Sequence, residues 1–343
     1  MRQLLNTLYV TSEGAYLAKQ GETVIVRLDG QIKLQVPIHT LGGIVCFSTA
    51  GCSPALLGLC AQRGVALSFF TTRGRFLARV TGAVSGNVLL RREQYRRADD
   101  ARFAADIARS LIAGKIANSR HVLLRALRDH PQAEGMQRVA QAANRLARVQ
   151  RRLGIPASVD AVRGMEGEAG RNYFSVFDHL IVAQKKAFYF ERRSRRPPMD
   201  AVNALLSFLY TLLRHDVAAA LEGVGLDPGV GFLHRDRPGR PGLALDLMEE
   251  LRSAIADRLA LNLINRKQVT ATGFTVSESG GVAMNDATRK AVLVAYQKRK
   301  QEEIQHPFLK ERIAIGLLPH AQALLLARHL RGDLDGYPPM IWR

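Results

Sequence analysis

The hydrophobic pattern of this chain changes once, near residue 90, and this change limits the fold more than any other feature. Before that point, apolar and polar residues alternate in short runs such as TVIVRL and QIKLQVPI, and a period of two residues is typical of strands. Asp29-Gly30 separates these two runs, and this pair favours a tight hairpin in which both central residues have positive φ. After about Arg91 the apolar spacing is helical. The sequence therefore predicts an α+β protein with two domains.

Residues 1–86 are predicted to form a small N-terminal β domain with one short helix. Ser53 suits the N-cap of that helix, the proline after it suits the first helical position, and Gly64 suits its end. We expect a linker over residues 87–98 and a larger, mainly α-helical catalytic domain over residues 99–343. Because the β domain has few titratable residues, we expect it to be a scaffold for dimerisation.

Two smaller features of the helical domain can also be predicted. The segment GFTVSESGGVA, residues 273–283, has the pattern of a short strand followed by a glycine turn, so we expect a small hairpin. The C-terminal segment DLDGYPPMIWR cannot continue a helix past its two prolines. We expect this tail to be mobile or to dock on a partner through Trp342.

The chain is strongly basic, with 49 Lys and Arg residues against 30 Asp and Glu residues and a formal net charge of +19. This charge indicates a polyanionic partner or an anionic membrane surface. The membrane is less favoured because no run of 18 or more apolar residues occurs and the first 30 residues lack the order of a signal peptide. The three cysteines form no C-x-x-C pair, as in a reducing compartment. We expect a cytoplasmic protein that binds nucleic acid.

Arginines gather in three clusters along the chain: Arg91, Arg92, Arg96 and Arg97; Arg145, Arg148, Arg151 and Arg152; and Arg192, Arg193, Arg195 and Arg196. A run of like charges is usually a solvated face, but repeated arginine-rich clusters favour contact with a DNA backbone, because a guanidinium can grip a phosphate with two hydrogen bonds. The positions that we expect to contact DNA are Lys185, Lys186, Arg192, Arg193, Arg195, Arg196, Arg235, Arg237 and Arg240.

Four residues in three segments could bind a metal ion: Glu166 in MEGEAGRNYF, His234 in GFLHRDRPGR, and Asp246 and Glu249 in LALDLMEELR. Leucines at four-residue spacing predict a helix in the third segment, which places its two acids one turn apart. Carboxylates with one imidazole suit Mg²⁺ or Mn²⁺. Each signal has an ordinary explanation when taken alone. Acids near a helix start complement the helix dipole, and a histidine in the glycine- and proline-rich segment 223–242 could be an ordinary surface residue.

Taken together, these segments resemble a known family, the CRISPR-associated adaptation integrases, which are metal-dependent DNases that insert new spacers into a repeat array. Four segments match in order and spacing: GMEGEAGRNYF, RRPPMDAVNALLSFLYTLL, GLDPGVGFLHRDRPGRPGLALDLMEELR and NRKQV. The opening MRQLLNTLYVTSEGAYLAKQGETVIV looks like the start of the subtype I-C branch. The resemblance therefore covers nearly the whole chain.

The resemblance implies which residues are catalytic. Glu166, His234 and Glu249 match the positions that hold one Mg²⁺ or Mn²⁺ in the family, and Asp246 lies close by. Some relatives have Asp where this chain has Glu249, so the choice between Glu249 and Asp246 as direct ligand stays open.

Two more polar residues are candidates for a role near the metal. Tyr173 follows Glu166 by seven residues and would share its side of one continuous helix, although Gly167 and Gly170 make an unbroken helix less certain. Asn203 lies in the second matching segment. We expect Tyr173 and Asn203 to lie behind the metal ligands or to contact DNA, with ordinary packing as the alternative.

The resemblance also implies a reaction and partners. The 3′-hydroxyl of a short DNA fragment would attack a phosphodiester at a CRISPR repeat boundary, in defence against phage and plasmids. The chain would form a homodimer through its β domain, and two dimers would bracket a dimer of a small ferredoxin-like adaptation partner. Two alternatives stay open: a metal-dependent nuclease on branched or damaged DNA, and a basic nucleic-acid-binding protein without catalysis.

Overall fold

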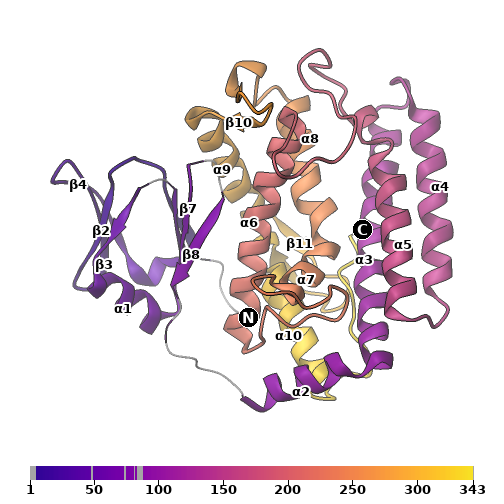
Figure 1. Ribbon diagram of the computed structural model, residues 1–343, viewed down its shortest axis with the longest axis horizontal. Helices are drawn as coiled ribbons and strands as arrows, with labels where there is room; N and C mark the ends of the chain where they lie inside the picture. The colour runs from indigo at the N-terminus through magenta and orange to yellow at the C-terminus, as the bar shows by residue number, and fades with distance from the viewer. Residues whose placement is uncertain (1–4, 48, 73–74, 81, 83–87, 343) are drawn as a thin grey trace. The chain divides into compact units, whose positions relative to one another are not determined.

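The computed structural model describes residues 5–47, 49–72, 75–80, 82 and 88–342. It divides into two compact units, drawn in Figure 1. The first, which we call the β unit, contains Met1–Gly86 and Asp286–Glu302, and the second, the helical unit, contains Asn87–Asn285 and Glu303–Arg343. The predicted α+β class is confirmed.

The described part of the β unit contains two four-stranded sheets. In the first sheet, β1, β5 and β7 run parallel and β8 closes the edge in the antiparallel direction. The first sheet, in spatial order, is β1 (Asn6–Val10), β5 (Leu41–Phe47), β7 (Ala66–Phe70) and β8 (Phe76–Val80). The second is β4 (Gln31–Pro37), β3 (Thr23–Leu28), β2 (Tyr16–Gln20) and β6 (Gly51–Cys52).

The local predictions for the β unit are confirmed. Asp29 and Gly30 have φ values of 52° and 76° in the turn between β3 and β4. Helix α1 (Pro54–Arg63) begins after Ser53, whose hydroxyl accepts a hydrogen bond from Leu56 N, and it ends at Gly64, whose φ is 65°. Each of these features depends on residues close together in sequence, which is why the sequence predicts them.

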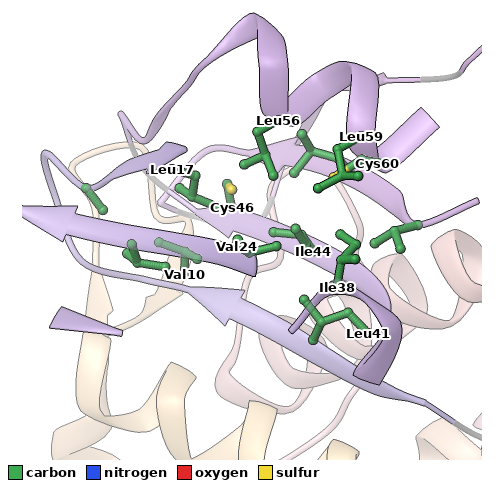
Figure 2. Close-up of a cluster of buried hydrophobic side chains, with 14 residues drawn as sticks. Val10, Leu17, Val24, Ile38, Leu41, Ile44, Cys46, Leu56, Leu59 and Cys60 are labelled. Atoms are coloured by element: carbon green, nitrogen blue, oxygen red, sulfur yellow. The ribbon is translucent and has the colours of Figure 1, made fainter. Parts of the chain in front are cut away.

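The core of the β unit forms where α1 packs against the strands (Figure 2). Leu56 and Cys60 from α1 and Ile44 and Cys46 from β5 are fully buried in this apolar cluster. Burial raises the pKa of the Cys60 thiol to about 11, so this thiol stays protonated at neutral pH and packs as an apolar side chain.

Helix α9 (Asp286–Gln301) groups with the β unit rather than with the rest of the predicted catalytic domain. Arg289 explains part of this grouping, because its guanidinium donates to the carbonyl oxygen of Thr72 and lies 5.9 Å from the centre of the Phe47 ring. These partners are more than 200 residues away in sequence, so helical periodicity alone could not reveal them.

The helical unit is built around α3, which packs against α4, α5 and α7 (Figure 1). A π-helical segment, Ser253–Asp257, joins α7 to α8. Phe274–Val276 (β9) and Val282–Met284 (β10) form the hairpin that we expected, and Glu303–Gln305 (β11) pairs with Arg312–Ala314 (β12). The helices are α2 (Val88–Asp99), α3 (Ala101–Asp129), α4 (Met136–Leu153), α5 (Val159–Phe174), α6 (Ala201–Val224), α7 (Gly242–Arg252), α8 (Arg258–Asn265) and α10 (Leu318–Leu330).

The segment that we expected to be a linker, residues 87–98, forms helix α2 from residue 88 onward, and residue 87 lies outside the described residues. The sequence of α2 is polar, but Gln94 is fully buried and forms hydrogen bonds with the loop before α7. The Gln94 amide donates to the carbonyl oxygens of Asp227 and Val230 at 2.8 Å each and accepts from Asp227 N at 2.9 Å. These long-range hydrogen bonds tie α2 to the helical unit.

Helix α6 is long and apolar enough, by length and composition, to cross a membrane, since its most apolar window has a mean hydropathy of 1.3. In this protein 67% of that window is buried, and α6 packs against α7 and α10. We therefore interpret α6 as the core helix of the helical unit.

The C-terminal tail docks on its own chain, which corrects the expectation of a mobile or partner-bound tail. Tyr337 Oη donates to Glu250 Oε1 at 2.5 Å, and Met340 N donates to Glu250 Oε2 at 2.8 Å. Trp342 N donates to Asn118 Oδ1 on α3 at 2.6 Å. These contacts could not be predicted from local sequence, because Glu250 and Asn118 are distant in sequence from the tail.

Candidate metal centre

Three elements of the helical unit carry the predicted metal ligands. Glu166 lies in α5, which is continuous through its glycines and begins after the Ser158 cap. Glu249 and Asp246 lie on α7, and His234 lies in the loop before it. Both α5 and α7 pack against α3, so α3 is the element that brings these segments together.

An ammonium group from α3 joins two of the predicted ligands. Lys115 Nζ forms an ion pair with Glu166 Oε1 and lies 2.7 Å from Glu249 Oε2. Lys115 is 7% exposed and Glu249 is 5% exposed. The two carboxylates therefore share one buried cation. The sequence analysis missed Lys115, which is 51 residues from Glu166 and belongs to none of the segments that carried the resemblance.

Arg252 supplies a second positive charge, with Nη2 lying 2.6 Å from Glu249 Oε2. Burial by itself raises the pKa of Glu249, but the charges of Arg252 and Lys115 outweigh burial and lower that pKa to about 2. Glu249 is therefore ionised at neutral pH, as a metal ligand must be. The three-residue spacing of Glu249 and Arg252 on one helix is a signal that the sequence did contain.

Asp246 organises the histidine loop. It is fully buried, and its Oδ2 accepts hydrogen bonds from Phe232 N at 2.6 Å and Leu233 N at 2.8 Å. Its Oδ1 accepts from His234 N at 3.0 Å and lies 2.5 Å from His234 Nδ1. A Cβ at Gly231 would lie 2.5 Å from Asp246 Oδ2, so the close approach of this loop requires glycine there.

These contacts bear on the choice between the two acids of α7. Both oxygens of Asp246 are occupied by the loop, and the carboxylate fixes His234 through Nδ1, which leaves Nε2 as the nitrogen available to a metal. Carboxylates commonly orient metal-binding histidines in this way. The geometry therefore favours Glu249 as the direct ligand and Asp246 as the residue that positions His234.

The donor set fits a hard divalent cation, because two carboxylates and one oriented imidazole are ligands that Mg²⁺ and Mn²⁺ accept. Within the described ranges, however, no three His, Cys, Asp or Glu side chains already converge as a metal-binding group. The ammonium of Lys115 lies on both glutamates instead. Glu166, His234 and Glu249 could hold a cation once this ammonium leaves at least one of them.

Tyr173 and Asn203 occupy different surroundings. Tyr173 is 3% exposed and lines a small cavity with Lys115, Glu249 and Asp257, so it lies behind the predicted ligands. Asn203 is fully buried near the start of α6. This geometry gives Asn203 a structural role instead of the expected contact with DNA or with the ligands.

The hydrogen bonds of Asn203 explain that role. Its side-chain oxygen accepts from Arg193 Nη1 at 2.6 Å and from Ser194 N at 3.0 Å, and its amide nitrogen donates to the carbonyl oxygen of Arg192 at 2.8 Å. Arg193 also bonds Ser207 Oγ at 3.0 Å. Arg193 therefore bonds to the Asn203 side chain inside the helical unit. This corrects our expectation that Arg193 contacts DNA.

The other predicted DNA contacts lie at or near the surface. Two of them already have acidic neighbours: Lys185 Nζ lies 2.6 Å from Asp178 Oδ2, and Arg235 Nη2 lies 3.1 Å from Asp160 Oδ1. Arg240 is half-buried. The exposed residues of the set are Lys185, Lys186, Arg192, Arg195, Arg196, Arg235 and Arg237.

Comparison with known sequences identifies close relatives. The family model described as CRISPR associated protein Cas1 matches residues 8–298. A protein of Chlorobaculum tepidum named CRISPR-associated endonuclease Cas1 1 is 56% identical over 343 residues, which cover 100% of both chains. A Rhodospirillum rubrum protein named CRISPR-associated endonuclease Cas1 2 is 54% identical over 348 residues, again with 100% of both chains covered.

Comparison with solved structures supports the same grouping at the level of the fold. A Cas1 protein from Thermotoga maritima superposes with a TM-score of 0.81 at 24% identity, covering 96% of this chain and 97% of that chain. A casposase bound to its integration product superposes with a TM-score of 0.83 at 18% identity, covering 99% and 95% of the two chains.

Proposed function

Because this chain belongs to the Cas1 family of CRISPR-associated endonucleases, we propose that it inserts short DNA fragments into a CRISPR repeat array by metal-dependent transesterification. The observation that carries this proposal is the grouping of Glu166 and Glu249 on one buried ammonium, beside a histidine oriented by Asp246. An acidic group of this kind within a chain of net charge +19 suits phosphodiester chemistry, since the polyanion needs the basic surface.

The residues have separate tasks in the proposed reaction. A Mg²⁺ or Mn²⁺ held by Glu166, His234 and Glu249 would supply Lewis-acid chemistry at the phosphodiester. Asp246 would keep His234 Nε2 directed at that position, because it holds both the ring and the backbone of the loop. Arg252 would keep Glu249 ionised.

The same proposal includes partners. DNA would bind along the exposed Lys and Arg residues of the helical unit, and the β unit would form a homodimer. A small ferredoxin-like adaptation protein would hold two dimers of this chain. The chain would act in the cytoplasm, with no membrane partner. Within the family, this chain would belong to the subtype I-C branch. One structural neighbour is a Cas6-RT-Cas1–Cas2 complex, which superposes with a TM-score of 0.82 at 22% identity, and covers 100% of this chain and 36% of that chain. It supports the idea of protein partners.

An integration assay tests the function. Purified protein, a supercoiled plasmid with a CRISPR repeat, a labelled DNA fragment and Mn²⁺ should give fragment covalently joined to plasmid. Glu166→Gln should abolish joining, because the uncharged amide is a poor ligand for a hard cation. The matched control is Glu168→Gln, two residues further along α5. The Glu168 carboxylate pairs with exposed Arg152 at 2.7 Å, and the Glu168→Gln protein should join DNA normally.

The products separate the alternatives. Shortened DNA without joined product would indicate a nuclease that uses water as the nucleophile. DNA binding with neither cleavage nor joining in any divalent metal would indicate a binding protein without catalysis. Equal joining by wild type and Glu166→Gln would contradict the proposed metal centre.

A further inference from the structure

At the candidate metal centre, two carboxylates and two cationic side chains are joined in one chain of direct ion pairs. Glu166 and Glu249 contribute two negative charges, and Lys115 and Arg252 contribute two positive charges, all joined through direct ion pairs. The side chains of Lys115, Glu249 and Arg252 are 9%, 6% and 13% exposed. The attraction among these three side chains is therefore only weakly screened by solvent, whereas the Glu166 side chain is 31% exposed. Both carboxylates are already compensated in the absence of any divalent ion.

The two cations differ in how firmly they are held. Arg252 lies three residues from Glu249 on the same helix, and its guanidinium also lies 5.0 Å from the centre of the Tyr210 ring. Lys115 reaches the carboxylates from another helix, α3, on a flexible stem that ends in a compact charge. If Glu166 and Glu249 held a divalent ion, the Lys115 ammonium is the group that would have to move, because it contacts both carboxylates.

A divalent ion that enters alone would bring two further positive charges close to Lys115 and Arg252, which already balance the two glutamates. Like charges at short distance in such surroundings are unfavourable. A phosphodiester of DNA at the same place would offset that charge and would offer the displaced ammonium new oxygen partners. Metal and phosphate should therefore bind more strongly together than apart.

We propose that Lys115 couples metal binding to DNA binding: its ammonium occupies the cation position in the free protein and transfers to a DNA phosphate when Mg²⁺ or Mn²⁺ enters. This inference rests on the proposed metal centre and adds a binding order to it. The free protein holds a divalent ion weakly, and DNA completes the site. Thermodynamic linkage then requires that metal strengthen DNA binding by the same factor.

The test measures Mn²⁺ binding to the full-length protein by calorimetry or electron paramagnetic resonance, with and without a short DNA duplex. In wild type, DNA should lower the Mn²⁺ dissociation constant by about 10-fold or more, within the usual range of coupling between sites. Lys115→Gln should bind Mn²⁺ about 10-fold more tightly than wild type without DNA, and the duplex should change that affinity by less than about 3-fold. Lys290→Gln, which removes an exposed lysine of α9, should match wild type.

The outcomes are distinct from those that test the function itself. If Lys115→Gln and wild type bind Mn²⁺ equally without DNA and respond equally to DNA, Lys115 is a structural ion-pair partner and the coupling proposal is wrong. If the Lys115 variant fails to fold, the wild-type measurement still tests the proposal. A wild-type Mn²⁺ affinity that is the same with and without DNA contradicts it. Failure of wild type to bind Mn²⁺ under either condition would instead overturn the metal centre.

Discussion

The β unit and the helical unit of this chain are stabilised differently. The cluster between α1 and the strands of the β unit consists of aliphatic and cysteine side chains. The interior of the helical unit also contains buried ionisable side chains, including Glu249, Glu250 and Asp257. Burying a charge is costly unless it is paired, and strongly perturbed ionisable groups gather at functional sites. We therefore propose that the β unit is a scaffold and that the buried ionisable groups of the helical unit serve the reaction at a cost in stability.

Loss of a buried charge should have the largest effect. Glu249→Ala leaves Lys115 and Arg252 without their shared carboxylate partner, and breaking a buried ion pair from one side destabilises a protein by about 3–5 kcal/mol. Trp342, the single tryptophan, lies in the tail docked on α3, so its fluorescence during urea unfolding reports on the helical unit. The partly exposed control Glu168→Gln should unfold as wild type does. A loss below about 1 kcal/mol would mean that solvent already compensates these charges.

Truncation of an apolar side chain in the β unit should lower the free energy of unfolding by a comparable or slightly smaller amount, through a cavity instead of an unpaired charge. Leu56 is fully buried in the cluster beneath α1, and Leu56→Ala should destabilise the fold by about 2–5 kcal/mol, because it removes apolar contacts and leaves a cavity. Circular dichroism during unfolding would measure this loss. Mn²⁺ affinity should stay unchanged, because the predicted ligands lie in the helical unit, and a large drop in that affinity would contradict this expectation.

Glu250 should make the helical unit sensitive to pH. Burial raises the pKa of Glu250 to about 7, although hydrogen bonds from Tyr337, Gln322 and Met340 N oppose burial. The folded protein therefore keeps a proton on Glu250 that the unfolded chain releases above about pH 4.5. The contribution of Glu250 to the free energy of unfolding is full below pH 4.5 and falls as pH rises toward 7, by on the order of 1 kcal/mol per pH unit.

Urea unfolding followed by Trp342 fluorescence at several pH values measures this slope. Glu250→Gln should remove the Glu250 contribution between pH 4.5 and 7, because the amide does not titrate. Glu249 provides an internal contrast, because its pKa is lowered to about 2, so its contribution is lost only as pH falls below 4.5. An identical slope in wild type and Glu250→Gln would mean that Glu250 is ionised in the folded protein.

A backbone change in the β unit should have the smallest effect. Gly30 has a φ of 76° in the hairpin turn, and Gly58 lies in α1 with an ordinary helical φ; a Cβ at either position would meet no other atom within 4 Å. Gly30→Ala should destabilise the protein by about 1 kcal/mol, because alanine is strained at positive φ. Gly58→Ala should stabilise it by about 0.5–1 kcal/mol, because alanine favours the helix. Equal effects of the two changes would contradict this explanation.

Much of the β unit and part of the helical unit could be predicted from the sequence. The Asp29-Gly30 turn, the cap of α1 and the β9–β10 hairpin depend on residues within a few positions of one another. The segments that contain Glu166, His234 and Glu249 also carried the family resemblance, whose coarse form, the Cas1 family, is confirmed. The ligand roles of these residues stay a prediction.

The sequence by itself therefore determined the change from strands to helices, several turns and caps, the family and the candidate acids, because these depend on local periodicity and short motifs. The tertiary structure decided which groups meet: Lys115 with Glu166 and Glu249, Asp246 with His234, and the tail with Glu250. The physical reason is that an ion pair or a buried hydrogen bond depends on distance and on exclusion of water. Both are set by how α3, α5 and α7 pack, and no local stretch of the chain encodes that packing.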